Sequence, residues 1–587
     1  MGLIGIAVRK LIYLRKKNDM SGSIFELSSN VNFKFEKKTF SEMINERSFE
    51  TKQDISFSNC IFNEAVILEN IIAREILFFE CHFKNQFYLG KSVFHYISFY
   101  GCTTESDIDI ISNTADALSF RSLKVRELEI NGNYQSIQFV SSKAEKVLVN
   151  DVNNNHSHRE SKIEFLVENE FQELKLECST SFSQIIFKGG FYKSLFFEGE
   201  FKKKILFSGV IKIDNLYFES SVFHNRIDFE EGDFEYVSFY RSSFYGLVYL
   251  NDMYYVNTKP RSLKIKDLSF HSSNFEKDVT IHISKIESFN CSNCNFKEVF
   301  NLNNFSKEKL VSEMVSIGFN GINQGSIIIE QIYAHIALAG INLGNIYFKD
   351  LDIYIISILD YQNNGSLTFS NIKSGDYFII QNTISGKMNF LNSDINLFNE
   401  IIIANSDIDG ANFNKYPIKI LSQSKSPILG YGIDKRFLRI SNLKNVYNQL
   451  KKIAKTKGDI DTANRYESLE HKQLLLSKKI GFDSVLLFLN YVSNDNGRSW
   501  FRGVFFTLTI GLIFFIIYLK TIGIEFYFNQ YYQDYVIFIT SFPKLELKEY
   551  SNLNEGWKTQ LVVWLSRIFI SYGIYQTISA FRKYGKT

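Results

Sequence analysis

Three short stretches of the sequence repeat one pattern at a step of 21 residues: Ile55–Cys60 (ISFSNC), Ile76–Cys81 (ILFFEC) and Ile97–Cys102 (ISFYGC). Each has an apolar residue, a phenylalanine two positions later and a cysteine at matching places. A fixed period of this length is typical of a solenoid, in which successive coils of the chain stack on one another. Each unit reads as a short strand followed by a turn, and such strands bury their apolar face only by stacking. We therefore predict a parallel β-helix with an internal ladder of phenylalanines.

The phenylalanine period continues along the chain, although it is not uniform. The step of 21 returns at a later set of phenylalanines, Phe348, Phe369 and Phe390. Between Phe187 and Phe239 the spacing halves to ten or eleven residues. Residues 103–117 and 300–325 depart from any tidy period, and we expect insertions or a change of sheet there.

One segment carries a family resemblance. Residues Ser406–Phe413 (SDIDGANF) have an apolar centre followed by small and polar residues, and they resemble the repeat of the pentapeptide-repeat family. The resemblance implies a pentapeptide-repeat-like solenoid. The expected fold is thus mainly β, a parallel β-helix followed by a helical linker and a two-helix transmembrane channel-like domain. The expected segments are a basic amphipathic N-terminal segment (1–20), a β-helix ligand-sensing domain (21–430), a helical linker (431–497) and a transmembrane domain (498–587).

The composition narrows the class of protein. The chain has 587 residues with 57 Phe and 32 Tyr but only 4 Pro, which excludes a disordered or collagen-like chain. Lys and Arg exceed Asp and Glu by 66 − 63 = 3, so the net charge of the chain gives no indication of a nucleic-acid or acidic partner. The sequence has no phosphate-binding glycine loop with lysine, no nucleophile elbow and no His-Glu-x-x-His motif. We therefore expect a protein that is not an enzyme and that needs no cofactor.

The cysteines and histidines do not form a recognisable metal site. Six cysteines are too few for a disulfide scaffold, which favours a reducing compartment. The 21-residue spacing of Cys60, Cys81 and Cys102 favours a stacked thiol ladder over a metal or disulfide site. Cys291 and Cys294 form a Cys-x-x-Cys without a second pair, so turn packing is a better interpretation than zinc. His156 and His158 belong to a polar loop.

Helical periodicity appears at both ends of the β-helix. Residues 1–20 combine apolar positions at helical spacing with five basic residues, so this segment either lies on a membrane surface or caps the solenoid. From Leu443 the apolar period becomes helical, and Gly458 separates two predicted helices. This predicted hairpin resembles the linker of bacterial pentapeptide-repeat proteins that end in ion-channel-like modules.

The C-terminal region predicts two membrane spans. Residues 503–519 carry no charge and lie between Arg502 and Lys520, and a second apolar stretch runs from about 559 to 581. The basic flanks of both spans fall on one side, which the positive-inside rule makes cytoplasmic. We therefore expect a bacterial inner (plasma) membrane protein with a cytoplasmic β-helix domain and with membrane lipid as a partner.

Two features favour an ion channel over a simple anchor hairpin. Residues 531–542, between the spans, are apolar enough for a re-entrant pore helix. Arg567 inside the second span needs water or a partner, because an ionisable side chain facing lipid is costly. Gln560 and Ser571 share its helix face, so we predict a pore or gating site at Arg567, Ser571 and Gln560. The arrangement resembles two-span ion channels, which implies a homo-oligomer, a tetramer by analogy, although no Thr-Val-Gly-Tyr-Gly potassium filter is present.

A large cytoplasmic solenoid on a small channel implies that it senses a signal. The architecture resembles the effector family of the Hailong anti-phage defence system, in which a crown domain binds a single-stranded DNA oligomer that restrains an ion channel. The resemblance implies a nucleic-acid or nucleotide ligand, supplied by a partner nucleotidyltransferase. Tyrosines interleaved with basic residues suit single strands, which stack on aromatic rings beside positive charge. The predicted ligand-binding residues are Tyr240, Arg241, Tyr245, Tyr249, Tyr254, Tyr255, Lys259, Arg261, Lys264 and Lys266. A second basic cluster is Lys202–Lys204.

Two other interpretations remain open. The first is a non-conducting membrane-anchored scaffold whose β-helix binds a protein partner. The second is a secreted β-helix adhesin or polysaccharide lyase. The C-terminal spans and the absence of a signal peptide pattern disfavour this secreted protein. The tyrosines between 236 and 255 also have a plain explanation, because they can simply cover the outer surface of the solenoid.

Overall fold

The computed structural model describes most of the chain. The described residues are 33–36, 38–40, 44–46, 48–153, 162–178, 184–251, 263–282, 285–303, 315–373, 375–413, 418, 440–477, 481–525, 528–540 and 556–584. Several residues and segments singled out in the sequence lie outside them: the N-terminal segment 1–20, His156, His158, Tyr254, Tyr255, Lys259 and Arg261.

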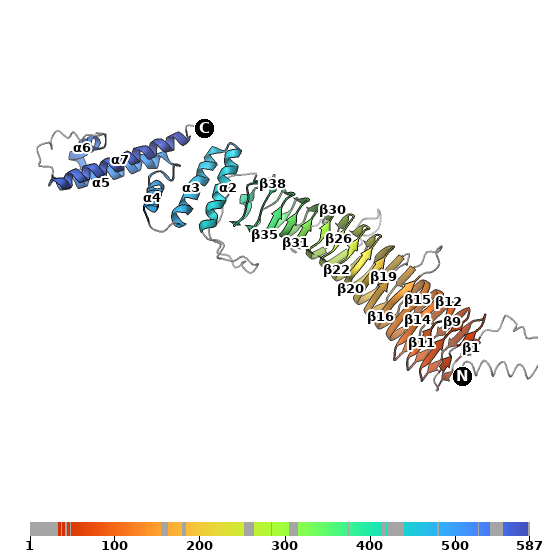
Figure 1. Ribbon diagram of the computed structural model, residues 1–587. Helices are drawn as coiled ribbons and strands as arrows, with labels where there is room; N and C mark the ends of the chain where they lie inside the picture. Colours follow the sequence, from red (N-terminus) through yellow and green to blue (C-terminus); the bar gives the residue numbers. More distant parts are fainter. Residues whose placement is uncertain are drawn as a thin grey trace, which may run out of the picture. The chain divides into compact units, whose positions relative to one another are not determined.

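The main body is a parallel β-solenoid of about 15 turns that covers residues 35–412. Figure 1 shows its strands stacked in successive coils. The predicted ladder is present: the ring centroids of Phe57 and Phe78 lie 5.1 Å apart, and those of Phe78 and Phe99 lie 4.9 Å apart. These distances match the spacing of about 4.8 Å between neighbouring strands. The parallel β-helix predicted from the 21-residue period is therefore confirmed.

The first coils consist of short strands separated by turns, as the sequence predicts. Ile55, Phe57 and the equivalent residues of later coils point inward, whereas the residues between them are half-buried. The strands are β1 (Phe33–Glu36), β2 (Thr39–Phe40), β3 (Ile44–Glu46), β4 (Phe49–Glu50), β5 (Ile55–Ser58), β6 (Ile61–Phe62), β7 (Val66–Glu69), β8 (Ile71–Ile72), β9 (Glu75–Phe79), β10 (His82–Phe83), β11 (Phe87–Gly90), β12 (Val93–Tyr100) and β13 (Thr103–Thr104).

The next coils differ from the prediction, because their strands continue around corners and become long. The irregular stretch at 103–117 stays in the solenoid, where the pairing of β14 with β15 shifts register between Ile110 and Asn113. The halved spacing after Phe187 reflects two ladders per coil: Phe187 stacks on Phe207, and Phe197 stacks on Phe218. The strands are β14 (Ile108–Arg121), β15 (Lys124–Val140), β16 (Lys143–Asn153), β17 (Lys162–Leu166), β18 (Glu170–Cys178), β19 (Gln184–Phe201) and β20 (Lys204–Phe223).

The later coils return to shorter strands. In the irregular region 300–325, residues 304–314 lie outside the described residues, and β31 follows them. The strands are β21 (Ile227–Phe229), β22 (Gly232–Tyr240), β23 (Ser243–Phe244), β24 (Val248–Asn251), β25 (Leu263–His271), β26 (Asn274–Phe275), β27 (Val279–His282), β28 (Lys285–Ser292), β29 (Asn295–Phe296), β30 (Val299–Asn303), β31 (Val315–Asn323), β32 (Ser326–Glu330), β33 (Tyr333–Asn342), β34 (Asn345–Lys349), β35 (Asp352–Asn363), β36 (Ser366–Ser370), β37 (Tyr377–Gln381), β38 (Lys387–Leu391), β39 (Glu400–Ala404) and β40 (Ala411–Asn412), with a 3-10 turn η1 (Ile395–Leu397).

The cysteines at the 21-residue step form one of the hydrogen-bonded corners of the solenoid. The Sγ atoms of Cys81 and Cys102 lie 3.5 and 3.4 Å from the carbonyl oxygens of Phe57 and Phe78, one coil away. Ser242 makes the equivalent bond in a later coil, where its Oγ donates to the carbonyl oxygen of Phe218 at 3.0 Å. Burial raises the pKa of the Cys60 thiol, so the neutral, donating form persists at neutral pH. The predicted thiol ladder is therefore a structural hydrogen-bonding device.

Helices follow the solenoid and confirm the predicted change of period. The helices are α2 (Ile440–Thr456), α3 (Ile460–Ser477), α4 (Phe482–Asn494), α5 (Trp500–Thr521), α6 (Phe528–Thr540) and α7 (Trp557–Tyr584). Helices α2 and α3 form the predicted hairpin, in which Leu443, Leu450 and Tyr466 are buried. Two of the helices, α5 and α7, are long and apolar enough to cross a membrane.

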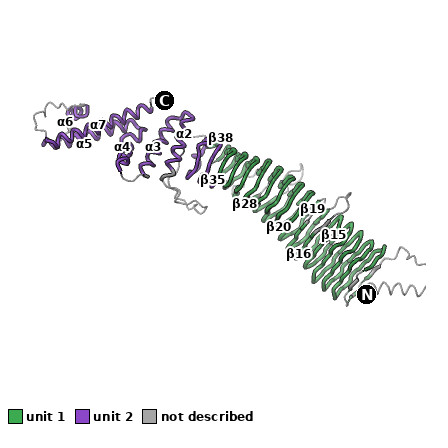
Figure 2. Tube along the Cα trace, viewed as in Figure 1, with its two compact units in different colours: residues 1–357, 361–376, 389–393 green, residues 358–360, 377–388, 394–587 purple. Residues whose placement is uncertain are grey.

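The described chain divides into two compact units, coloured separately in Figure 2. The first comprises Met1–Ser357, Tyr361–Asp376 and Asn389–Ser393. The second comprises Ile358–Asp360, Tyr377–Met388 and Asp394–Thr587, so the last strands of the solenoid belong with the helices. This grouping has a direct cause within the second unit. Gln449 of α2 accepts a hydrogen bond from the Ile408 amide at 2.7 Å and donates to the Ser406 carbonyl at 3.3 Å, pairing the open edge of the last coil.

Candidate functional site

The two membrane-length helices pack antiparallel through small residues. Trp500 at the start of α5 lies 4.9 Å from Phe581 near the end of α7, measured between ring centroids. A Cβ atom on Gly503 would come within 2.6 Å of Thr577 Oγ1, so only glycine permits this approach of the backbones. Small residues are typical of such close contacts between helices in membranes. Because the helices are antiparallel, the basic residues at the start of α5 and the end of α7 lie at the same end.

Helix α6 returns from the far end of α5 to its middle. α5 has 22 residues and is about 33 Å long, and Gly511 lies at its midpoint. A Cβ atom on Gly511 would be 2.9 Å from the side chain of Ile539, which belongs to the last turn of α6. The ring of Phe538 lies 5.3 Å from that of Phe515. The C-terminal end of this 13-residue helix is therefore placed halfway along α5.

Arg567 of α7 caps that end of α6. Its Nη1 donates a hydrogen bond of 2.8 Å to the carbonyl oxygen of Phe538, and its guanidinium carbon lies 5.4 Å from the Phe538 ring centroid. The last carbonyls of a helix have no partner within the helix and carry partial negative charge. Arg567 is only 9% exposed, and its Nε and Nη2 have no hydrogen-bond partner among the described residues. The guanidinium thus neutralises the C-terminal end of α6, and its Nε and Nη2 atoms remain available to donate hydrogen bonds to another partner.

The other two predicted pore residues have different surroundings. Gln560 and Ser571 lie on the same face of α7 as Arg567, because the three residues are separated by seven and four positions on one helix. Gln560 is exposed and Ser571 is half-buried, whereas Arg567 is buried under α6. Of these three residues, Arg567 is therefore the one that lies against α6.

A polar joint, not singled out in the sequence, connects α4 with α7. Asn494 Nδ2 donates to the carbonyl and side-chain oxygens of Gln576 at 3.1 and 2.6 Å. Gln576 Nε2 donates to Asn490 Oδ1 at 2.8 Å, and the Tyr572 hydroxyl also donates to Asn490. The signals that could have revealed it are the polar residues Tyr572 and Gln576 inside an otherwise apolar span.

The turn between α4 and α5 extends this joint to α3. Asp495 and Asn496 have left-handed backbones with φ of 54° and 55°, which Asp and Asn tolerate better than most residues. Ser468 of α3 donates to Asp495 at 3.1 Å, and Asn496 donates to the Ser468 carbonyl at 3.3 Å. Lys583 of α7 forms a 3.3 Å ion pair with Glu467 of α3. We call this set, with Asn490, Asn494, Tyr572 and Gln576, the α3–α7 joint.

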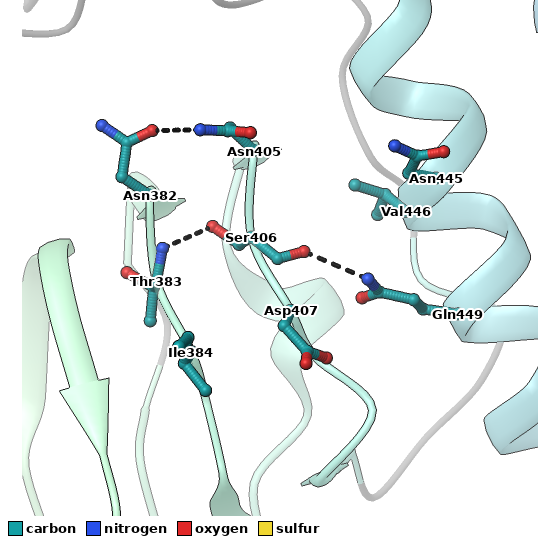
Figure 3. A pocket seen from close by; sticks show the side chains of 9 residues that line it. All are labelled: Asn382, Thr383, Ile384, Asn405, Ser406, Asp407, Asn445, Val446 and Gln449. Carbon is teal, nitrogen blue, oxygen red and sulfur yellow. Dashed lines mark hydrogen bonds between the residues drawn. The ribbon is translucent and has the colours of Figure 1, made fainter.

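A pocket of about 410 Å³ lies within the second unit, between the last coils and α2 (Figure 3). It is lined by Asn382, Thr383, Ile384, Asn405, Ser406, Asp407, Asn445, Val446 and Gln449. Asn405 donates to Asn382 at 2.8 Å, and the Thr383 amide donates to Ser406 Oγ at 3.1 Å. The lining offers amides, hydroxyls and one carboxylate without any Lys or Arg. It therefore does not fit a phosphate group.

The predicted ligand-binding residues of the solenoid fall on separate ladders. Tyr240 pairs with His271 of the next coil, and their rings stack at 5.2 Å. Tyr249 pairs instead with Asp228 and Thr280. Of the remaining described residues, Arg241 covers the Tyr240 ring at 4.9 Å, and Lys264 and Lys266 are exposed. Residues five to nine positions apart lie on different sides of a coil, so the sequence cluster does not form one continuous face.

The structure does bring part of this group together with basic residues of earlier coils. Tyr245 is 51% exposed, and its ring stacks on that of His224 at 5.2 Å. Arg226 covers the Tyr249 ring at 4.6 Å. Lys204 forms a 2.6 Å ion pair with Asp228, which also pairs with Arg226. The residues His224 and Arg226 were missed in the sequence, although the 21-residue step relates His224 to Tyr245.

Cys291 and Cys294 occupy core positions of the solenoid. Cys291 replaces a phenylalanine of the ladder, because it pairs with Phe270 and Phe319. Burial raises the pKa of the Cys291 thiol well above its usual value, which leaves it protonated and a poor metal ligand. Among the described residues, no three His, Cys, Asp or Glu side chains are grouped closely enough to hold a metal ion.

The arrangement can therefore place a charged side chain and a helix end at the middle of a membrane, joined by polar contacts to the helices that follow the solenoid. No protein-family model matches the chain, and the searches of curated proteins and of solved structures give no match either.

Proposed function

We propose that this protein is a subunit of a gated membrane ion channel, with the β-solenoid as its sensing domain. The observation that carries the proposal is the position of α6, whose C-terminal end lies halfway along α5 and is capped by Arg567. Non-helical backbone at the middle depth of a membrane is tolerated only where protein buries it or where it lines a water-filled cavity. A plain anchor needs neither a half-length helix nor a buried arginine.

A pore of this type requires several copies of the chain. One α5–α6–α7 set cannot enclose a path, and large apolar side chains such as Phe505, Trp564 and Tyr575 are 60–65% exposed on it. In an assembly these side chains would face lipid or neighbouring subunits. We therefore propose a homo-oligomer, a tetramer by analogy with two-span channels.

The α3–α7 joint supports a route by which the sensing domain controls the pore. α2 pairs with the last coil through Gln449, and Lys451 of α2 forms a 2.6 Å ion pair with Glu470 of α3. α3 then contacts the α4–α5 turn through Ser468 and the end of α7 through Glu467. A displacement of α2 and α3 would thus reach both membrane-length helices.

The nature of the signal rests on the resemblance to the Hailong effectors. We propose a nucleic-acid or nucleotide ligand, such as a single-stranded DNA oligomer, and a role in bacterial anti-phage defence. Two aromatic–basic contacts on the solenoid, Tyr245 with His224 and Tyr249 with Arg226, support this, since they place rings beside basic side chains. The pocket of Figure 3 does not, because its lining has no cation.

Recordings from the full-length protein in a planar lipid bilayer test the channel proposal. We expect discrete current steps, whose frequency changes when a single-stranded DNA oligonucleotide is added on the solenoid side. The control is the oligonucleotide added to His224→Ala/Arg226→Ala protein, which should conduct without responding. Absence of steps from inserted oligomers, with and without oligonucleotide, would contradict conduction and favour a membrane-anchored scaffold.

We place the basic ends of α5 and α7, and the solenoid with them, in the cytoplasm, following the positive-inside rule. A membrane-impermeant thiol reagent added to intact cells should then label Gly556→Cys, at the opposite end of α7, and should leave Lys455→Cys of α2 unlabelled. Both positions are exposed in the structure. Labelling of Lys455→Cys alone would reverse this orientation.

The scaffold interpretation has one observation in its favour. Phe79 and Tyr100 stack at 5.0 Å on the outside of the solenoid and are 40% and 44% exposed. Exposed aromatic residues are enriched where proteins bind one another. A scaffold would bind its partner there without conducting, and the bilayer recordings separate the two functions.

A further inference from the structure

Helix α4 carries a large apolar surface that nothing in the described chain covers. Phe482 is 80% exposed, Phe488 is 54% exposed and Val485 is 50% exposed. Leu486 and Val492, each 43% exposed, extend the same surface. At 3.6 residues per turn these five side chains share one side of the helix. Isolated exposed apolar residues are ordinary, but a contiguous group of this size indicates a binding surface.

The opposite side of α4 is fixed to the membrane-length helices. Asn490 and Asn494 bond to Tyr572 and Gln576 of α7, as described for the α3–α7 joint. Only five residues separate α4 from α5, and the Gly497 amide donates to Asn494 Oδ1 at 2.7 Å within that turn. The orientation of the apolar side relative to α5 and α7 is therefore set by hydrogen bonds. Figure 1 shows α4 crossing the direction of these two helices.

The level of α4 along the spans is that of a membrane–water interface. Gln576, to which α4 is attached, lies next to Thr577, which contacts Gly503 in the first turn of α5. Trp500, a residue type enriched in the interfacial region, meets the Phe581 ring at this end. Arg498 in the α4–α5 turn and Arg502 in the first turn of α5 are exposed, each 3.9 Å from Asp495, and would also reach lipid headgroups, which are often anionic.

We propose that the apolar side of α4 docks on the lipid bilayer, with the helix lying in the plane of the interface. Phe482, Val485 and Phe488 would enter the boundary between headgroups and acyl chains, as expected for an interfacial amphipathic helix. The inference rests on the membrane insertion of α5 and α7 in the proposed function. In this arrangement the lipid contact of α4 holds the α4–α5 turn at the membrane surface. A movement of α3 would then be transmitted through this turn to α5 and α7.

Fluorescent labels on the two sides of α4 test this docking. Full-length Val485→Cys and Asp483→Cys proteins would carry an environment-sensitive fluorophore in vesicles of equal parts phosphatidylcholine and phosphatidylglycerol. Residues two positions apart lie on opposite sides of a helix, and both of these are exposed. Labelled wild type sets the background from the native cysteines. We expect lipids brominated on their acyl chains to quench the label at 485, and aqueous iodide to quench the label at 483.

Two outcomes would overturn the proposal. Iodide quenching at 485 equal to that at 483 would show that the apolar side faces water. Protection of 485 from both quenchers, together with disulfide cross-linking between two copies of Val485→Cys protein, would make a second subunit the occupant. These readouts do not require conduction. A conducting protein with 485 in water therefore refutes only this inference, whereas lipid quenching at 485 in a silent protein refutes only the channel.

Discussion

Replacing Arg567 with leucine is expected to lower the ion flux through reconstituted oligomers by about tenfold or more. This magnitude is that of losing one hydrogen bond from a charged group at a site shielded from water. Leucine fills similar space but leaves the Phe538 carbonyl and the negative end of α6 without a partner at the middle of the membrane. Arg567→Ala should have the same effect. Arg567→Lys should retain part of the flux, because it keeps the charge and loses the planar guanidinium. The measurement is ion flux per assembled oligomer in liposomes, under conditions in which the wild type is open.

The matched control is Lys520→Leu, because Lys520 is an exposed basic residue in the last turn of α5, outside the α3–α7 joint, and its replacement should leave flux nearly unchanged. An arginine that only fastens helices gives a different result. In that case Arg567→Leu would reduce the yield of oligomers while leaving flux per oligomer equal to wild type, and Arg567 would have no part in conduction.

The second large effect is expected from Phe78→Ala in the solenoid. Phe78 is 1% exposed and stacks on Phe57 and Phe99, so its removal leaves a cavity in the ladder that costs about 3–5 kcal/mol. In a solenoid each coil contacts only its neighbours, so the loss should be local. Hydrogen–deuterium exchange should therefore accelerate roughly a hundredfold or more at the amides of residues 55–102 and remain near wild type in α2 and α3.

The neighbouring residue supplies the control for this prediction. Phe79 is 40% exposed and stacks on Tyr100 at the outer surface, so Phe79→Ala should cost about 1 kcal/mol. Equal acceleration of exchange in Phe78→Ala and Phe79→Ala proteins would contradict the assignment of the inner and outer faces.

The fold was predictable from sequence because one physical requirement repeats in every coil. Most coils present a large apolar side chain, often phenylalanine, to the ladder and many present a small donor to the corner, so Phe57 and Cys60 recur as Phe78 and Cys81. The halved spacing after Phe187 has the same cause, because each coil there contributes one phenylalanine to each of two ladders. Long strands such as β19 and β20 were not predicted, because the alternation of side chains does not show whether a strand continues around a corner.

The candidate site was predictable only in part. The cost of a charge among apolar residues identifies Arg567, and the apolar stretch at 531–542 gives α6 nearly its observed bounds of Phe528–Thr540. The depth at which α6 ends depends on Gly511, because the absence of a side chain there lets Ile539 pack against α5. No pattern in the sequence predicts that contact. The α3–α7 joint pairs Asn494 with a residue 82 positions away, which no local period can reveal.

The grouping of Tyr245 with His224 follows the same logic in the solenoid. Proximity in sequence suggested that Tyr240, Tyr245 and Tyr249 act together, yet in a solenoid residues of successive coils are the true neighbours. Reading the sequence coil by coil, at a step of 21 residues where no insertion intervenes, is therefore the better guide to surfaces on this chain.

Cryo-electron microscopy of the full-length protein in lipid nanodiscs tests the central claim most directly. The account predicts a symmetric oligomer in which α5 and α7 cross the bilayer, α6 ends at mid-depth and Arg567 lies beside a water-filled path along the axis. A single copy surrounded by lipid would contradict it. So would an oligomer in which α6 lies on the membrane surface and no continuous path crosses between the subunits.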